Sequence, residues 1–186
     1  MTKKELRKEL ISRRKELEKS YRVISDESIY NKLKDCPEVK AASTILTYIS
    51  TEIEVDTIMF IKEILCIGKR VAVPKCEGKN MRFIVISDFS ELKKGAFGIP
   101  EPTGGEEITD FSNSVCVTPA LSFNENGFRL GYGGGFYDRF AEKFDGTSIG
   151  ICYESFIGDI PLEKFDRPVD ILITDEKIRY MHRNEV

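Results

Sequence analysis

The sequence predicts a single α/β domain in which a mostly parallel β-sheet is flanked by helices, a Rossmann-like three-layer architecture. The chain has 186 residues, a length typical of one domain. Hydrophobic residues make up 41% and charged residues 32%, a mixture typical of globular proteins. Short apolar runs alternate with helix-forming stretches, and this alternation indicates strands connected by helices. We therefore expect residues 1–186 to form one domain.

The first helix is predicted over residues 3–19, where good helix formers dominate. Lys3 and Arg7 are four residues apart, so they project from the same side of this helix. An apolar stripe of leucines would cover the core side. The stripe consists of Leu6, Leu10 and Leu17.

A second helix is predicted over about residues 26–34. Ser25 is expected to be its N-cap, because a serine hydroxyl can accept a bond from an unpaired amide of the first turn. Ile29 and Leu33 would face inward. Pro37 marks the end of the helix, since the residue before a proline avoids the helical conformation.

A βαβ unit is predicted next. Residues 44–49 form a short apolar run and are expected to be a buried strand, and residues 70–73 form a second strand that ends at Pro74. Asp56 can cap the helix between them, and Gly68 is a natural stop for it. Strand, helix and strand within about thirty residues indicate a parallel pair. The apolar residues of the helix are Ile58, Ile61, Ile64 and Leu65.

The second half of the chain supplies the other strands. Residues 81–86 and 115–118 are predicted strands, and a turn is expected at 122–127. Residues 93–114 are rich in glycine, proline and charge and are predicted to be a long ordered loop. Both a functional loop that closes over a ligand and a plain surface excursion fit this composition. The last elements are a helix at about 135–143, core strands at 148–153 and 170–174, and a short edge strand at 178–180.

Cysteine and histidine usage excludes several classes of site. The five cysteines are widely spaced, with no C-x-x-C pair and no neighbouring histidine, so a zinc site is not expected. The only histidine, His182, lies near the C-terminus and is expected to be solvated, which disfavours histidine-centred catalysis. The chain shows neither a secretory h-region nor the roughly 20 apolar residues of a membrane span. A cytoplasmic protein without a membrane partner is therefore expected.

The charge of the chain is unevenly distributed. Residues 1–22 carry nine Lys/Arg and four Glu, a net charge of +5, whereas the whole chain carries −3 and the remainder therefore −8. A basic segment on an acidic body indicates local attraction for an anion. A nucleic-acid-binding module built on the first helix stays an alternative, although the body is acidic and no recognition motif is present.

The chemistry is concentrated in the run Arg129–Arg139, which reads Arg-Leu-Gly-Tyr-Gly-Gly-Gly-Phe-Tyr-Asp-Arg. Its four glycines allow positive φ and close approach of a ligand, and their amides at a helix start form an anion cradle. Arg129 adds a permanent charge suited to phosphate, and Asp138 adds a hard oxygen for Mg²⁺. Phe136 and Tyr137 offer flat faces for a ring.

The run does not match the common nucleotide motifs. No Gly-Lys-Ser/Thr follows, as a Walker A loop requires, and the G-x-G-x-x-G spacing is not met. Glycine-rich turns before helices are also often only structural. A different ATP-dependent kinase or ligase on the same cradle is a second alternative.

The composite pattern closely resembles the signature of the 5-formyltetrahydrofolate cyclo-ligase family, also called methenyltetrahydrofolate synthetases. Other segments resemble the same family in the same order, so the resemblance covers about residues 3–175. Thr118 departs from it mildly, since an apolar residue is usual there. These segments are Lys-x-x-Leu-Arg at residues 3–7, Ser-Thr-Glu-Ile-Glu-Val-Asp-Thr at 50–57, Phe-Gly-Ile-Pro-Glu-Pro at 97–102, Thr-Pro-Ala-Leu-Ser-Phe at 118–123 and Val-Asp-Ile-Leu-Ile-Thr at 169–174.

The resemblance implies an enzyme that uses ATP and Mg²⁺ to convert 5-formyltetrahydrofolate into 5,10-methenyltetrahydrofolate, ADP and phosphate. Phosphorylation of the formyl oxygen would activate the formyl carbon for attack by the substrate's own N10. The protein then needs no Ser, Cys or His nucleophile and acts by positioning and charge stabilisation. A monomer is expected that binds small molecules, including folate with or without a polyglutamate tail, and no nucleic acid.

The resemblance also implies roles for individual residues, each with a plainer alternative. Lys3 and Arg7 also fit a solvated basic helix, Glu54 fits helix-dipole charge, Ile49 fits plain core, and Asp170 fits a turn. The implied ATP contacts are Lys3, Lys4, Glu5, Leu6, Arg7, Arg129, Leu130, Gly131, Tyr132, Gly133, Gly134, Gly135, Phe136 and Tyr137, with Arg129 and Tyr137 as catalytic residues. The implied folate contacts are Ile49, Glu54, Tyr132, Gly133, Gly134, Gly135 and Phe136, and the implied Mg²⁺ ligands are Asp138 and Asp170.

Overall fold

The computed structural model describes residues 1–95 and 98–181, and within them a seven-stranded sheet forms the centre of the fold. The strand order is β11-β10-β9-β6-β1-β2-β3. Neighbours from β10 to β2 pair in parallel, whereas the edge strands β3 and β11 are antiparallel. The strands are β1 (Thr44–Thr47), β2 (Arg70–Glu77), β3 (Asn80–Ile86), β6 (Ser114–Thr118), β9 (Thr147–Cys152), β10 (Ile171–Thr174) and β11 (Ile178–Tyr180).

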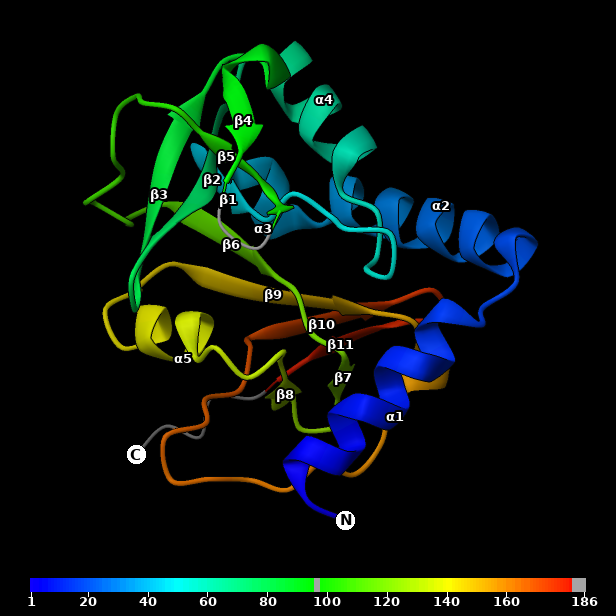
Figure 1. The fold of residues 1–186 in the computed structure, drawn as a ribbon. Coiled ribbons are helices and arrows are strands. Elements are labelled where there is room, and N and C mark those ends of the chain that lie inside the picture. The colour runs from blue at the N-terminus through cyan, green and yellow to red at the C-terminus, as the bar shows by residue number, and fades with distance from the viewer. Residues whose placement is uncertain (96–97, 182–186) are drawn as a thin grey trace.

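Helices lie on both sides of the sheet, so the predicted single-domain three-layer fold class is confirmed (Figure 1). Helices α2, α3 and α4 lie on one side of the sheet, α5 and a small hairpin lie on the other, and α1 lies across the end of the sheet, where Leu10 packs in the same apolar cluster as α2 and α4. The hairpin pairs β7 (Ser122–Phe123) with β8 (Arg129–Leu130). The helices are α1 (Lys3–Lys15), α2 (Lys19–Asp35), α3 (Pro37–Ala41), α4 (Ile58–Cys66) and α5 (Phe136–Ala141).

Both faces of the sheet are apolar, as is usual for parallel strands covered by helices. Successive side chains of β1 point to opposite faces. Ile45 packs in the larger apolar cluster with Phe60 of α4, whereas Leu46 packs in a second cluster with Phe83 and Phe140. Burial on both sides explains why β1 reads as a continuous apolar run rather than an alternating one.

The start of the chain differs from the prediction. The helix predicted over residues 3–19 ends at Lys15, and the second helix starts at Lys19 instead of about residue 26. Ser25 is not an N-cap, because it lies inside α2 and its hydroxyl donates to Asp175 Oδ2 at 3.0 Å. The Ser25 hydroxyl, which suggested a helix start, therefore bonds a residue far along the chain instead.

The predicted βαβ unit is present, with α4 between two parallel strands. Asp56 Oδ1 accepts the amide of Ile58 at 2.8 Å, as expected of a residue that caps this helix. Gly68 has φ of 79° just beyond the helix, and its amide donates to Leu65 O at 3.0 Å. A left-handed glycine closing the last turn is a common helix stop.

The second strand of the unit is longer than predicted, because β2 continues through Pro74 to Glu77. The end predicted at Pro74 is therefore wrong. Strand β1 pairs with residues Arg70–Ala72 of β2. The edge of β2 that faces β1 is therefore not paired with β1 at Pro74. A residue without an amide hydrogen is tolerated at such an edge position.

The predicted loop 93–114 is ordered by short-range pairing at its described residues. Strand β4 (Leu92–Lys94) pairs with β5 (Pro100–Pro102), a small sheet that the sequence did not predict. The amide of Ile108 donates to Phe83 O at 2.9 Å, and this bond fastens the segment to β3. Residues 96 and 97, which include the first residue of the predicted family segment 97–102, lie outside the described residues.

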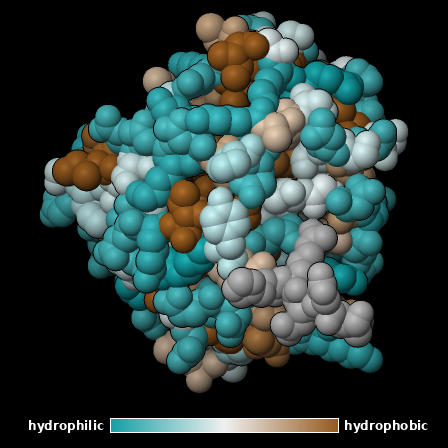
Figure 2. All heavy atoms as spheres, turned by 180° about the vertical axis from the view of Figure 1, so that it is seen from behind, coloured by the Kyte–Doolittle hydropathy of each residue, from teal (hydrophilic) through white to brown (hydrophobic). Residues whose placement is uncertain are grey.

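The remaining predicted elements are confirmed with small changes of boundary. The turn expected at 122–127 is the tip of the β7–β8 hairpin, and α5 is shorter than the predicted 135–143. The prediction for His182 lies outside the described residues. Among the described helices, none combines the length and apolar character needed to span a bilayer. Figure 2 shows one face of the molecule as mainly hydrophilic, with apolar side chains in separate small groups.

An ion pair at the edge of the sheet gives a pH-dependent prediction. Glu154, just after β9, accepts bonds from Arg179 at 2.5 Å and from the Thr174 hydroxyl at 2.6 Å. The Arg179 guanidinium lowers the pKa of Glu154 from 4.5 to about 2. A carboxyl group whose pKa is lowered on folding adds stability above its unfolded pKa, and that stability is lost as the pH falls toward the folded pKa.

We therefore expect the free energy of unfolding of the wild type to fall between about pH 5 and pH 3 by on the order of 1 kcal/mol more than that of Glu154→Gln. Urea unfolding curves at a series of pH values measure the difference. Equal pH dependence in the two proteins would contradict the assigned ion pair.

Candidate functional site

The candidate site lies where the parallel strands end. Strands β1, β6 and β9 run in the same direction, so the segments after Thr47, Thr118 and Cys152 meet at one edge of the sheet. Helix α1 and the β7–β8 hairpin lie beside this edge (Figure 1). In open α/β sheets, ligands bind outside the carboxyl ends of the strands.

Helix α1 is fastened to this edge by Arg14, a side chain that is only 1% exposed. Its guanidinium donates to the carbonyl oxygens of Ile53, Ala120 and Leu121 at 2.9, 2.8 and 3.0 Å. These carbonyls belong to the segments after β1 and after β6. One side chain therefore joins the helix to both segments.

The sequence did not single out Arg14, although a signal was available. Arg14 lies between Leu10 and Leu17 at helical spacing, so it belongs to the apolar stripe rather than to the exposed basic face. An arginine on an apolar stripe can only be buried with hydrogen-bond partners, because an unpaired buried charge is strongly unfavourable.

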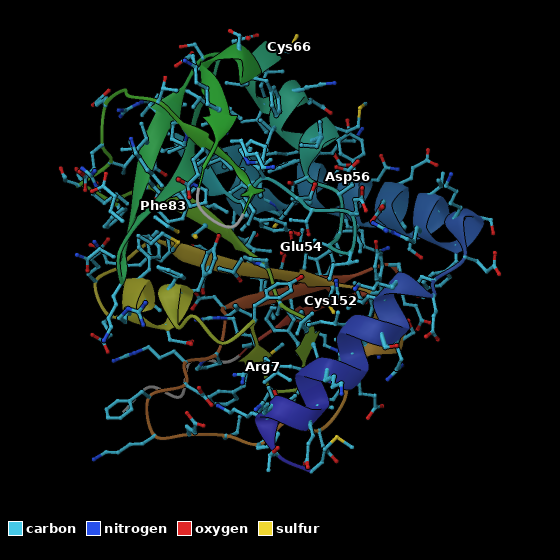
Figure 3. The ribbon with its side chains drawn as sticks, in the orientation of Figure 1. Arg7, Glu54, Asp56, Cys66, Phe83 and Cys152 are labelled. Atoms are coloured by element: carbon cyan, nitrogen blue, oxygen red, sulfur yellow. The ribbon has the colours of Figure 1, made fainter. Side chains whose placement is uncertain are left out.

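Arg7 connects α1 to the glycine-rich run. Its Nε donates to Gly131 O at 2.9 Å, across 124 residues of sequence. Figure 3 shows Arg7 beside the β8 end of the hairpin. Gly133 has φ of 102°, and a Cβ placed there would lie 3.4 Å from Arg7 Cζ. Glycine is thus favoured at 133 by the backbone conformation.

Lys3 is held at the start of the same helix. Its ammonium forms ion pairs with Asp166 at 2.8 Å and with Glu163 at 3.4 Å. Both acids belong to the segment between β9 and β10. Lys3 and Arg7 thus contact different parts of the chain from successive turns of α1, and both have a fixed position.

The other α1 residues predicted to contact ATP are Lys4, Glu5 and Leu6, and each lies in a different environment. Glu5 closes a capping box with Thr2, so its carboxylate stabilises the helix start. Leu6 packs against the larger apolar cluster, and Lys4 is exposed. Among the predicted N-terminal contacts, the structure therefore brings Arg7 to the glycine-rich run.

The glycine-rich run is closed by an ion pair between its two ends. Arg129, buried in β8, donates to Asp138 Oδ1 at 2.5 Å. Asp138 lies in the first turn of α5, which follows Gly135 in the left-handed conformation with φ of 65°. The pair therefore spans the intervening loop and fixes the entry to α5. Arg129 and Asp138 were predicted separately, and the structure places them in contact.

Tyr137 carries a buried hydroxyl without a hydrogen-bond partner among the described residues. Burial raises the pKa of Tyr137 well above its ordinary value, so the phenol is neutral and can donate its proton in a hydrogen bond. Buried polar groups nearly always have a partner in native proteins. A ligand oxygen is a fitting partner for this hydroxyl, and this observation agrees with a polar ligand beside the loop.

Glu54 is a buried carboxylate at the same edge, only 6% exposed. Its Oε2 accepts the amide and the hydroxyl of Thr51, both at 2.8 Å. Three phenols have pKa values raised first by burial and further by this carboxylate: Tyr48, Tyr132 and Tyr137. The segment after β1 and the glycine-rich run therefore meet around Glu54, whose position Figure 3 shows.

Ile49 and Asp170, two further predicted site residues, make contacts within the fold. Ile49 is buried in the larger apolar cluster just beyond β1. Asp170 directly precedes β10, at the amino end of the parallel strands, and its Oδ2 accepts the amide and hydroxyl of Ser148 at 2.8 Å. Asp170 therefore bonds the neighbouring strand β9, whereas Asp138 forms an ion pair with Arg129.

A magnesium ion would need ligands besides these carboxylates. Over residues 1–95 and 98–181, no group of three or more His, Cys, Asp or Glu side chains could hold a metal. Mg²⁺ is commonly held by one or two carboxylates together with phosphate and water oxygens. The residues present therefore fit a magnesium ion that arrives with a nucleotide rather than one held by the protein alone.

These features define an α/β protein in which a basic helix, a closed glycine-rich loop and a buried carboxylate gather at the carboxyl edge of the sheet. The chain belongs to the 5-formyltetrahydrofolate cyclo-ligase family, whose model matches residues 1–175. The predicted family is thereby confirmed, and with it the assignment as an enzyme of the ligase class.

Similar proteins cover most of the chain. The 5-formyltetrahydrofolate cyclo-ligase of Escherichia coli (strain K12) is 30% identical over an alignment of 151 positions that covers 76% of this chain and 83% of that protein. The enzyme of the same name from Mycoplasma pneumoniae is 30% identical over an alignment of 184 positions that covers 95% of this chain and 100% of that protein. A solved structure of Aquifex aeolicus 5,10-methenyltetrahydrofolate synthetase superposes with a TM-score of 0.88 at 31% identity and covers 100% of this chain and 96% of its own.

Proposed function

We propose that this protein converts 5-formyltetrahydrofolate into 5,10-methenyltetrahydrofolate and consumes ATP in the presence of Mg²⁺, with release of ADP and phosphate. The observation that carries the proposal is the closed glycine-rich loop, contacted by Arg7 from α1 and by Arg129 from β8. Two guanidinium groups on one loop suit the phosphates of a nucleotide. Family membership supplies the folate reaction.

The proposed chemistry explains why the site has no protein nucleophile. The formyl group is amide-like, and its oxygen is a poor leaving group. Transfer of the γ-phosphoryl group of ATP to that oxygen forms a phosphate ester, which is a good leaving group. N10 of the same folate then attacks the formyl carbon, and inorganic phosphate departs. The protein has to align the two substrates and stabilise the charge on the transferred group.

Residues of the loop are proposed to perform these tasks. Arg129 would stabilise the charge on the transferred phosphoryl group, and the Tyr137 hydroxyl would donate to a ligand oxygen. Lys3 and Arg7 would bind phosphate oxygens from one side of α1. Asp138 is the carboxylate proposed for Mg²⁺, whose role when bound is to neutralise phosphate charge. Asp170 was predicted as a second ligand, but it lies at the amino end of the parallel strands, where it bonds Ser148. The other contacts proposed for ATP are those predicted from the sequence.

The proposed folate site is built around Glu54, with Ile49 and the loop residues 132–136 beside it. A carboxylate can accept two parallel N–H donors, and the edge of a pterin ring presents such a pair. The bonds from Thr51 hold one oxygen of Glu54 in place, so the carboxylate is oriented before the ligand arrives. Of the three phenols near it, Tyr132 is exposed and can present a flat surface to a ring.

Replacing Glu54 with glutamine is expected to lower kcat/KM for 5-formyltetrahydrofolate by about 10- to 100-fold, the range for loss of a charge-assisted hydrogen bond. KM for ATP should stay within about twofold. Steady-state kinetics with each substrate varied in turn measure both effects. Glu52→Gln is the matched control, because Glu52 is exposed in the same segment. Similar losses in the two variants, or a rise confined to KM for ATP, would contradict the folate role.

The function itself is tested by the absorbance of methenyl-folate formed from 5-formyltetrahydrofolate, with and without Mg·ATP. Product that requires Mg·ATP and appears together with an equal amount of ADP is the expected result. Folded protein that binds ATP but forms no product would overturn the proposal and favour another ATP-dependent enzyme of this fold.

A further inference from the structure

The segment between β9 and β10 carries an anchored carboxylate. Asp166 Oδ2 accepts the amide of Glu163 at 2.7 Å, and the amide of Asp166 donates to Glu163 O at 3.1 Å. The two bonds close a tight turn that fixes the Asp166 carboxylate. The same oxygen also accepts Lys3 Nζ at 2.8 Å, across 163 residues of sequence.

This ion pair is largely removed from solvent. The side chains of Lys3 and Asp166 are 14% and 13% exposed, whereas that of Glu163 is 69% exposed. A lysine ammonium is a strongly hydrated charge on a long and flexible side chain. Here a fixed carboxylate determines where the ammonium lies.

Lys3 and Arg7 are one helical turn apart, and each is held by a segment far along the chain. Arg7 is held by the Gly131 carbonyl, and Lys3 is held by Asp166. An ammonium has three N–H donors, so the bond to Asp166 leaves others for a second acceptor. The two cations therefore lie on one side of α1, and Arg7 contacts the glycine-rich run.

We propose that Asp166 is a positioning residue for nucleotide binding: it holds the Lys3 ammonium in the place from which it contacts a phosphate of ATP. The inference rests on the proposed function, which assigns Lys3 to the nucleotide. An ammonium held in advance loses less rotamer freedom when phosphate binds. The negative charge of Asp166 weakens the attraction for phosphate, but Arg7 and Arg129 keep the surroundings positive, so the gain from positioning prevails.

The test is Asp166→Asn, because asparagine can still accept the Glu163 amide and close the turn. We expect the Kd of Mg·ATP, measured by titration calorimetry, to rise roughly three- to tenfold, as does KM for ATP. KM for 5-formyltetrahydrofolate and kcat should change by less than about twofold. Glu163→Gln is the matched control, since its exposed carboxylate lies 3.4 Å from the same ammonium, and its Kd should match the wild type.

A second background separates positioning from a general loosening of the fold. In Lys3→Met protein, Asp166→Asn should not raise the Kd of Mg·ATP, because the group that it positions is absent. An unchanged or lower Kd for Asp166→Asn alone, or equal rises in both KM values, would overturn the inference and leave the proposed function standing. A wild-type protein that binds no Mg·ATP would overturn both.

Discussion

Methionine in place of Arg14 is expected to lower the free energy of unfolding by about 3 to 5 kcal/mol. The change removes the donor that satisfies three carbonyl oxygens at the carboxyl edge of the sheet. Each acceptor left without a partner in a buried place costs about 1 to 3 kcal/mol, and methionine fills only part of the space. Urea unfolding followed by circular dichroism measures the loss.

Arg13→Met is the matched control for this prediction, because Arg13 is the adjacent residue of α1 and is exposed. It donates to one carbonyl, that of Ser155, at 3.0 Å. We expect a loss below about 1 kcal/mol for this variant. Equal losses for the two arginines would mean that Arg14 acts only through the helix itself and not through the segments that it joins.

Replacing Arg129 with methionine is expected to lower kcat/KM for methenyl-folate formation by about 10²- to 10³-fold, the range for removal of one preorganised donor to a developing charge. The guanidinium is buried within β8 and reaches the end of the loop at Asp138. Its removal also breaks the ion pair that joins the two ends of the glycine-rich run. Steady-state kinetics and thermal unfolding are measured on the same preparation.

Two further variants separate the effect of the Arg129 charge on activity from the effect of its ion pair with Asp138. Asp138→Asn keeps a hydrogen-bond acceptor for Arg129, so a loss confined to the Mg²⁺ dependence is expected there. Arg70→Gln removes an exposed ion pair with Glu106 at the amino end of β2, and its activity should match the wild type. If Arg129→Met retained wild-type kcat/KM while folded, the proposed role of Arg129 in phosphoryl transfer would be wrong.

Much of the fold could be predicted because its signals are local. The apolar runs at 44–49 and 170–174, the helix stop at Gly68 and the βαβ unit each depend on contiguous residues. The family signature is likewise contained in a single run. Spacing within such a run is a property of the sequence alone, so the fold class and the glycine-rich loop were predicted correctly.

The errors arose where a distant residue competes with a local signal. Serine is typical of a helix start, but the Ser25 hydroxyl bonds Asp175 and the helix begins about two turns earlier, at Lys19. Proline is typical of a strand end, but Pro74 lies beyond the residues that pair with β1, so the strand continues through it. Propensity is a weak preference, and tertiary contacts override it.

The sequence by itself determined the α/β class, the order of the elements and the loop that resembles the cyclo-ligase signature. Only the tertiary structure decided which carbonyl oxygens and acids hold the basic residues of the first helix. Arg14, Arg7 and Lys3 each have a partner more than a hundred residues away along the chain. Those pairings depend on the path of the folded chain, which brings the ends of parallel strands and the intervening segments to one edge, and no local spacing encodes that path.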